Sequence, residues 1–98
     1  MGLEYLFRRT DGEWFDFPLS RCEEVLRPHS FTARTMQGQG DHRIEINGCE
    51  ISFPFEDAGI QVCFKHDQFS EPEADQIVGE IAESITRLTG QVARGVSL

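Results

Sequence analysis

The feature that most constrains the fold is a long amphipathic pattern between Ser70 and Gly90. Apolar residues recur there at steps of three and four, which places them on one face of a helix of about five turns. The segment Ser70-Glu71-Pro72-Glu73 has the form of a capping box with proline in the first turn, where its missing donor costs little. Gly90 suits the left-handed position that ends a helix. The apolar stripe consists of Ala74, Ile77, Val78, Ile81, Ala82, Ile85 and Leu88.

The beginning of the chain has the period-two pattern of β-strands. Residues 3–8 alternate in this way, Asp11-Gly12 is a tight-turn signal, and residues 13–17 alternate again. We therefore expect an N-terminal hairpin over residues 3–17. The alternation puts Tyr5 and Phe7 opposite Leu6, and it puts Phe15 and Phe17 opposite Trp14 and Asp16.

A short helix is expected after this hairpin. Ser20-Arg21-Cys22-Glu23 has the form of a second capping box, and Pro28 should end the helix at Arg27. Two turns are too few to be stable alone, so this helix must pack on the sheet.

The middle of the chain predicts a meander of strands. We expect strands over residues 30–36, 43–46, 49–56 and 60–65. Asn47-Gly48 is the strongest hairpin signal in the chain, because a type I′ turn needs positive φ at both positions. Pro54 cannot donate to a ladder, so its strand is an edge, carries a bulge, or stops at Phe53. Glycine-rich residues 37–41 and the acidic segment 56–59 provide the other connections.

A helix with one apolar stripe and half-apolar strands together predict one α+β domain over residues 1–98. The expected architecture is a two-layer sandwich, in which a short helix and a long C-terminal helix cover one face of a mostly antiparallel sheet. That sheet combines the N-terminal hairpin with the meander. Residues 91–98 form either a short strand or a frayed tail.

Charge and hydropathy narrow the classes of partner. Nine lysines and arginines against 17 acidic residues give a net charge of −8, which disfavours binding to nucleic acids or anionic membranes. No apolar stretch approaches the ~18 residues of a membrane span. Residues 1–9 lack the basic start and apolar run of a signal peptide, so we expect a cytoplasmic protein.

The sequence offers no convergent set of reactive residues. The three histidines and three cysteines have no recognised zinc spacing, and strand alternation sends Cys49 inward and Cys63 outward, so we expect no metal. A Cys63–His66 dyad would require the strand to end between the two residues. Gly38-Gln39-Gly40 lacks the lysine and the following helix of a phosphate loop. We therefore predict no catalytic residue and no cofactor, and we lean against an enzyme.

Two surfaces favour recognition of a protein. A hairpin that is apolar on both sides is either sandwiched inside the domain or exposes one side to a second chain. The open sheet face would carry charged and hydrogen-bonding side chains. The candidate interaction surface consists of Tyr5, Leu6, Trp14, Arg34, Arg43, Gln61 and Cys63.

These observations lead to three functional hypotheses. The first is a non-enzymatic protein-interaction module that forms a homodimer or binds another protein. The second is a small ligand-binding protein or enzyme in which Arg34 and Arg43 approach each other beside Gln61 and Cys63 and hold a carboxylate or phosphate. The third is an inhibitor of a basic nuclease or toxin, by analogy with the architecture of many small bacterial proteins, including immunity partners of secreted toxins. Its phosphate-mimicking acids would be Glu71, Glu73, Asp75, Glu80 and Glu83.

Overall fold

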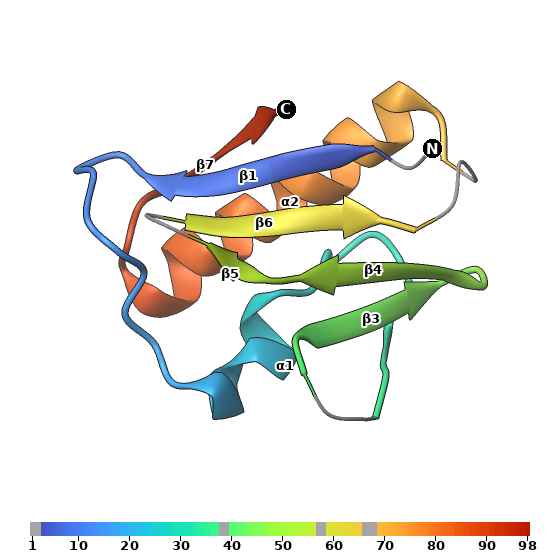
Figure 1. The fold of residues 1–98 in the computed structure, drawn as a ribbon, viewed down its shortest axis with the longest axis horizontal. Coiled ribbons are helices and arrows are strands. Elements are labelled where there is room, and N and C mark those ends of the chain that lie inside the picture. The colour runs from blue at the N-terminus through green and yellow to red at the C-terminus, as the bar shows by residue number, and fades with distance from the viewer. Residues whose placement is uncertain (1–2, 38–39, 57–58, 66–68) are drawn as a thin grey trace.

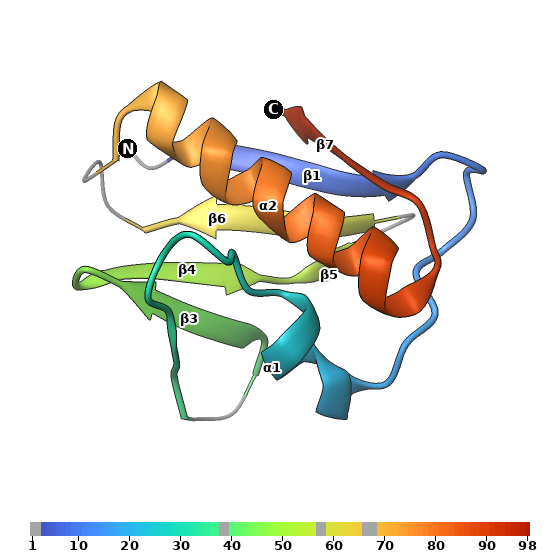
Figure 2. The same cartoon turned by 180° about the vertical axis from the view of Figure 1, so that it is seen from behind.

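A computed structural model describes residues 3–37, 40–56, 59–65 and 69–98, and it shows two layers (Figure 1). One layer is an antiparallel sheet. The other consists of helices α1 (Cys22–Val25) and α2 (Glu71–Thr89), which both lie on one face of that sheet (Figure 2). The expected α+β sandwich is confirmed.

The sheet does not follow the order of the sequence. Its strands are ordered β2-β3-β4-β6-β1-β7, and β5 pairs with β6 outside this path. All described pairings are antiparallel. The strands are β1 (Glu4–Arg9), β2 (Arg34–Thr35), β3 (His42–Ile46), β4 (Cys49–Phe53), β5 (Phe55–Glu56), β6 (Gly59–Phe64) and β7 (Ala93–Ser97).

Helix α2 begins and ends where the sequence predicts. The Ser70 hydroxyl accepts from the Glu73 amide at 3.4 Å, and a Glu73 carboxylate oxygen accepts from the Ser70 amide at 3.0 Å. Gly90 ends the helix with φ of 76°. The stripe from Ala74 to Ile85 is buried against the sheet, and this burial stabilises the two-layer arrangement.

The first helix is shorter than expected. A 3-10 turn over Leu19–Arg21 leads into α1, and the Arg21 amide donates to the Pro18 carbonyl at 2.9 Å. The capping box predicted at Ser20 is wrong, because the residue that precedes α1 is Arg21 and it makes no side-chain cap. Its apolar side is still buried, because Cys22 and Val25 belong to the core, and α1 lies beside α2 (Figure 2).

The meander is confirmed at its tightest turn. Asn47 has φ of 52° and Gly48 has φ of 82°, as a type I′ hairpin requires. Strand β4 ends at Phe53, before Pro54. The pairing with β6 keeps the same register on both sides of Pro54, whose carbonyl accepts from the Gln61 amide at 2.8 Å, so no bulge is inserted.

The strand predicted over residues 30–36 contributes only Arg34 and Thr35 to the sheet. Upstream, the Ser30 amide donates to a Glu80 carboxylate oxygen on α2 at 2.8 Å. The chain therefore crosses the helical side before it reaches the sheet edge (Figure 2).

The prediction of an N-terminal hairpin over residues 3–17 is wrong. The turn at Gly12 forms, with its amide donating to the Arg9 carbonyl at 3.1 Å, but residues 13–18 are not a strand. The reason is that both sides of β1 are occupied, by β6 on one side and by β7 on the other. Of the two alternatives for residues 91–98, the structure has the strand.

Helix α2 packs very closely on strand β7. A Cβ on Gly95 would lie 2.5 Å from Cγ1 of Val78 in α2. Only glycine leaves room for the helix at this point, so the C-terminal strand and the long helix are packed backbone against side chain.

Candidate functional site

The segment of residues 10–18, here called the Trp14 loop, carries an exposed tryptophan side chain. Phe15 and Phe17 are half-buried against the core, with ring centroids 6.3 Å apart, and Phe17 lies 6.2 Å from Phe55. The Trp14 side chain points away and is 55% exposed. The predicted alternation of these aromatic residues thus holds without a strand.

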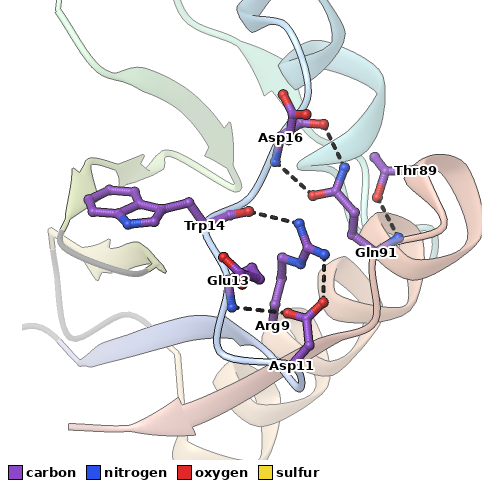
Figure 3. Close-up of polar contacts among 7 residues, drawn as sticks. All are labelled: Arg9, Asp11, Glu13, Trp14, Asp16, Thr89 and Gln91. Carbon is purple, nitrogen blue, oxygen red and sulfur yellow. Dashed lines mark hydrogen bonds and ion pairs between the residues drawn. The ribbon is translucent and has the colours of Figure 1, made fainter.

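Arg9 holds one side of the Trp14 loop. Its guanidinium donates to the Trp14 carbonyl at 2.8 Å and to an Asp11 carboxylate oxygen at 2.6 Å (Figure 3). The other Asp11 oxygen accepts from the Glu13 amide at 3.0 Å. The bond from Arg9, followed by that from the Glu13 amide, lowers the pKa of Asp11. The loop backbone is therefore fixed directly at Trp14.

Gln91 holds the other side of the Trp14 loop. Its side-chain oxygen accepts from the Asp16 amide at 2.7 Å, and its side-chain nitrogen donates to the Asp16 carbonyl at 2.6 Å (Figure 3). The Gln91 amide donates to the Thr89 hydroxyl at 3.1 Å, and that hydroxyl donates to the Ile85 carbonyl at 2.6 Å. The loop is thereby tied to the C-terminal end of α2.

These contacts make the Trp14 loop a preorganised surface. An exposed indole on a fixed backbone loses little conformational entropy when a partner covers it. Tryptophan is also enriched among the residues that dominate binding energy at protein interfaces.

Tyr5 lies in the core and not on an exposed surface. It points toward α2, is only 4% exposed, and donates from its hydroxyl to an Asp75 carboxylate oxygen at 2.7 Å. Burial, followed by the hydrogen bond and the charge of Asp75, raises the pKa of Tyr5 to about 12. Tyr5, which the sequence pattern placed on the candidate interaction surface, is therefore buried in the folded chain.

Apart from Trp14, the other predicted surface residues lie on the sheet face opposite the helices, and several of them already make polar contacts there. Arg34 pairs with Glu45 at 2.6 Å, and Arg43 lies 3.9 Å from a Glu50 carboxylate oxygen. Each of these arginine charges is met by its own glutamate, which weakens the case for a shared carboxylate or phosphate site.

The centre of the same face is organised by Glu4. One of its carboxylate oxygens accepts from the Gln61 side chain at 2.9 Å and lies 3.9 Å from the Cys63 sulfur. Leu6, the neighbouring residue on this face of β1, is half-buried. Leu6 is the cross-strand partner of Gln61, so Leu6, Gln61 and Cys63 lie together on this face.

Several acids of α2 serve the fold. Glu80, one of the acids expected to mimic phosphates, is only 8% exposed and accepts from the Ser30 amide and from the Gln76 side chain. Burial alone would raise the pKa of Glu80, but these hydrogen bonds outweigh it and lower the pKa. With Asp75 bound to Tyr5 and Glu73 in the capping box, these acids are poorly available to mimic phosphates.

Among the described residues, no group of three or more histidines, cysteines and acids could hold a metal ion. Burial lowers the pKa of His42, whose ring lies 5.8 Å from that of Phe53. His66 lies outside the described residues, as do Gly38 and Gln39 of the glycine-rich loop and residues 57–58 of the acidic turn. The Cys63–His66 dyad that the sequence pattern disfavoured therefore involves a residue that the structure does not describe.

No helix in the described part of the chain has both the length and the apolar character needed to cross a bilayer. Comparisons of the chain with protein-family models, with curated proteins and with solved structures find no match.

Sequence reasoning missed the two residues that organise the site, Arg9 and Gln91. Gln91 is 75 positions from Asp16, and nothing in local periodicity indicates that contact. For Arg9, the nearby Asp11-Gly12 turn signal was the available hint, because it brings the strand end and the loop close together.

Proposed function

We propose that this protein is a non-enzymatic protein-interaction module whose partner docks on the Trp14 loop. The observation that carries the proposal is the exposed indole of Trp14, whose own carbonyl is held by Arg9. A solvent-exposed tryptophan costs hydrophobic free energy in the isolated chain, and a partner that covers it recovers that energy.

The neighbouring aromatic residues support a docking surface larger than one side chain. Phe55 is exposed and its ring contacts that of Phe17, which in turn contacts Phe15. Both Phe15 and Phe17 belong to the Trp14 loop. Aromatic residues are enriched in interface cores, where they bury large areas with few rotatable bonds. The partner is either another copy of this chain or a different protein.

The test uses Trp14→Ala against a matched control, Leu98→Ala. Leu98 is also exposed, but its amide bonds to Glu4, at the end of β1 far from the Trp14 loop. Sedimentation of each variant over a range of concentrations tests self-association. Capture from the source cell, followed by titration with the purified partner, tests binding to another protein.

The fluorescence of Trp14 reports binding directly, since the chain contains one tryptophan. We expect its emission to shift to shorter wavelength and its quenching by iodide to fall when the partner binds. Trp14→Ala should weaken binding about tenfold or more, while Leu98→Ala should not. A strictly monomeric protein, with no partner that distinguishes these variants, would refute the proposal.

A further inference from the structure

Among the strands that the structure describes, β7 forms one edge of the sheet and pairs only with β1. It is five residues long, whereas β2 at the opposite edge has only two. Short strands protect a sheet edge against further pairing, and β7 lacks this protection. It also has no proline. The β7 edge is therefore the place where an additional strand can join.

The backbone of β7 presents a defined set of unused groups. The Val92 carbonyl accepts from Thr10, and the Leu98 amide donates to the Glu4 carbonyl, so even-numbered residues point toward β1. By alternation, the amides and carbonyls of Gly95 and Ser97 point to the open edge. Both residues are exposed.

Ala93 is the exception in this pattern. Its amide also points away from β1, but it donates to the Thr86 hydroxyl on α2 at 3.0 Å. A strand that joins β7 would therefore find two donors, at Gly95 and Ser97, and no unsatisfied amide at Ala93.

Two arginines stand beside this edge. Arg8 and Arg94 are direct cross-strand partners on the open face of the sheet, and both are exposed. Within the described part of the chain, neither guanidinium has a carboxylate or hydrogen-bond partner. Like charges directly opposite each other destabilise a strand pair. An anion placed between them would remove that repulsion.

The surface beside the arginines is hollowed. A hollow of about 410 Å³ is lined by Arg8, Arg9, Thr10, Gly12, Arg94 and Val96. It adjoins the start of β7, so a side chain that leaves an added strand on the open face can enter it.

We propose that the β7 edge accepts an extended segment of a partner protein as an added strand, with an acidic side chain of that segment bound by Arg8 and Arg94. Backbone bonds at Gly95 and Ser97 give affinity, and the arginine pair selects a carboxylate. The hollow borders the start of the Trp14 loop at Thr10 and Gly12, but the groups that would bind the added strand belong to β1 and β7 and do not include Trp14.

Charge complementarity favours this occupant over a second copy of the chain. Symmetric pairing of two β7 strands centred on Gly95 would bring a second Arg94 onto the same face, two positions along. It would also join two chains that each carry a net charge of −8. Both effects oppose a dimer through this edge.

The probes are two labelled peptides that alternate valine with glutamate or valine with lysine. Fluorescence anisotropy measures binding to the full chain and to three variants. Ser97→Pro removes only the amide that points to the open edge, and Ser97→Ala is its matched control with that amide intact. Arg94→Glu reverses the charge, and amide exchange at Gly95 and Ser97 reports pairing even if Ser97→Pro fails to fold.

We expect the glutamate peptide to bind about tenfold more tightly than its lysine twin. Ser97→Pro should weaken binding of the glutamate peptide about tenfold, whereas Ser97→Ala should not. The Arg94→Glu variant should bind the lysine peptide more tightly than the glutamate peptide. Three results would each overturn the proposal. The first is that neither peptide binds at about 1 mM. The second is that Arg94→Glu abolishes binding of the glutamate peptide while Ser97→Pro does not. The third is that the chain alone forms a dimer that Ser97→Pro dissociates.

Discussion

The side-chain amide of Gln91 brackets the backbone of Asp16, accepting from its N–H at 2.7 Å and donating to its carbonyl at 2.6 Å. A glutamine amide can do this because it carries a donor and an acceptor side by side, as a neighbouring strand does. Gln91 thus takes the role that a strand partner would have had for residues 13–17.

Gln91→Ala should release the Trp14 loop from α2. Losing the bonds to the Asp16 backbone should lower the free energy of unfolding by about 1–2 kcal/mol, measured by denaturant titration. Iodide quenching and fluorescence anisotropy should report a more mobile Trp14. Gln37→Ala is the control, because Gln37 is exposed and takes no part in this network. Equal effects of both variants would contradict the role of Gln91.

The hydroxyl of Tyr5 should ionise late. Its pKa is raised to about 12 from an ordinary value of 10.0, so the fold favours the neutral phenol. The resulting stabilisation is fully present below pH 10 and is lost as the pH rises toward 12. Because the chain contains one tyrosine, absorbance of the phenolate follows Tyr5 alone.

The matched variant for this titration is Asp75→Asn. It removes the carboxylate that accepts from Tyr5, so the pKa of Tyr5 should fall toward its ordinary value while its burial remains. A wild-type protein that forms phenolate near pH 10 while still folded would show that Tyr5 is not held as described.

Glu80 should give the protein a stability that depends on pH. Its pKa is lowered below the ordinary 4.5, so its contribution is present above that value and is lost as the pH falls through the lower, folded value. Glu80→Gln should cost about 1–2 kcal/mol at pH 7, because the bonds from Ser30 and Gln76 lose their charged acceptor. Urea titrations over a range of pH measure both effects.

The difference in the free energy of unfolding between wild type and Glu80→Gln should become smaller at acid pH. A ring nitrogen of His29 lies 3.9 Å from a Glu80 oxygen, and the charge of His29 also lowers the pKa of Glu80. Glu83→Gln is the control, since Glu83 is exposed on the same helix. A constant difference from pH 7 to pH 3 would show that the charge of Glu80 is not what stabilises the fold.

Gly95→Ala should destabilise the contact between β7 and α2. The new Cβ would lie 2.5 Å from Val78, and such overpacking costs about 1–3 kcal/mol. Val78→Ala in the same chain should recover part of the loss, so the double mutant should be more stable than the sum of the single changes predicts. Thermal unfolding of the four proteins in this cycle measures the coupling, and strict additivity would contradict the close approach.

Local signals in the sequence determined several elements of this protein. The stripe of α2 with its cap at Ser70, the Asn47-Gly48 turn and the alternation of β4 and β6 each depend on neighbouring residues. Local propensity is sufficient there, because each element presents one apolar face that burial then rewards. The alternation of Phe15 and Phe17 with Trp14 was also readable, although the expected strand was not formed.

Only the tertiary structure decided which strand pairs with β1 on the side opposite β6. The turn signal at Asp11-Gly12 favoured residues 13–17, but β7 occupies that place because Gly95 lets α2 pack closely on it. The same long-range packing buried Tyr5 and brought Gln91 to Asp16. Pairing partners are chosen by the total surface that the whole chain buries, and a local pattern contains no information about segments distant in sequence.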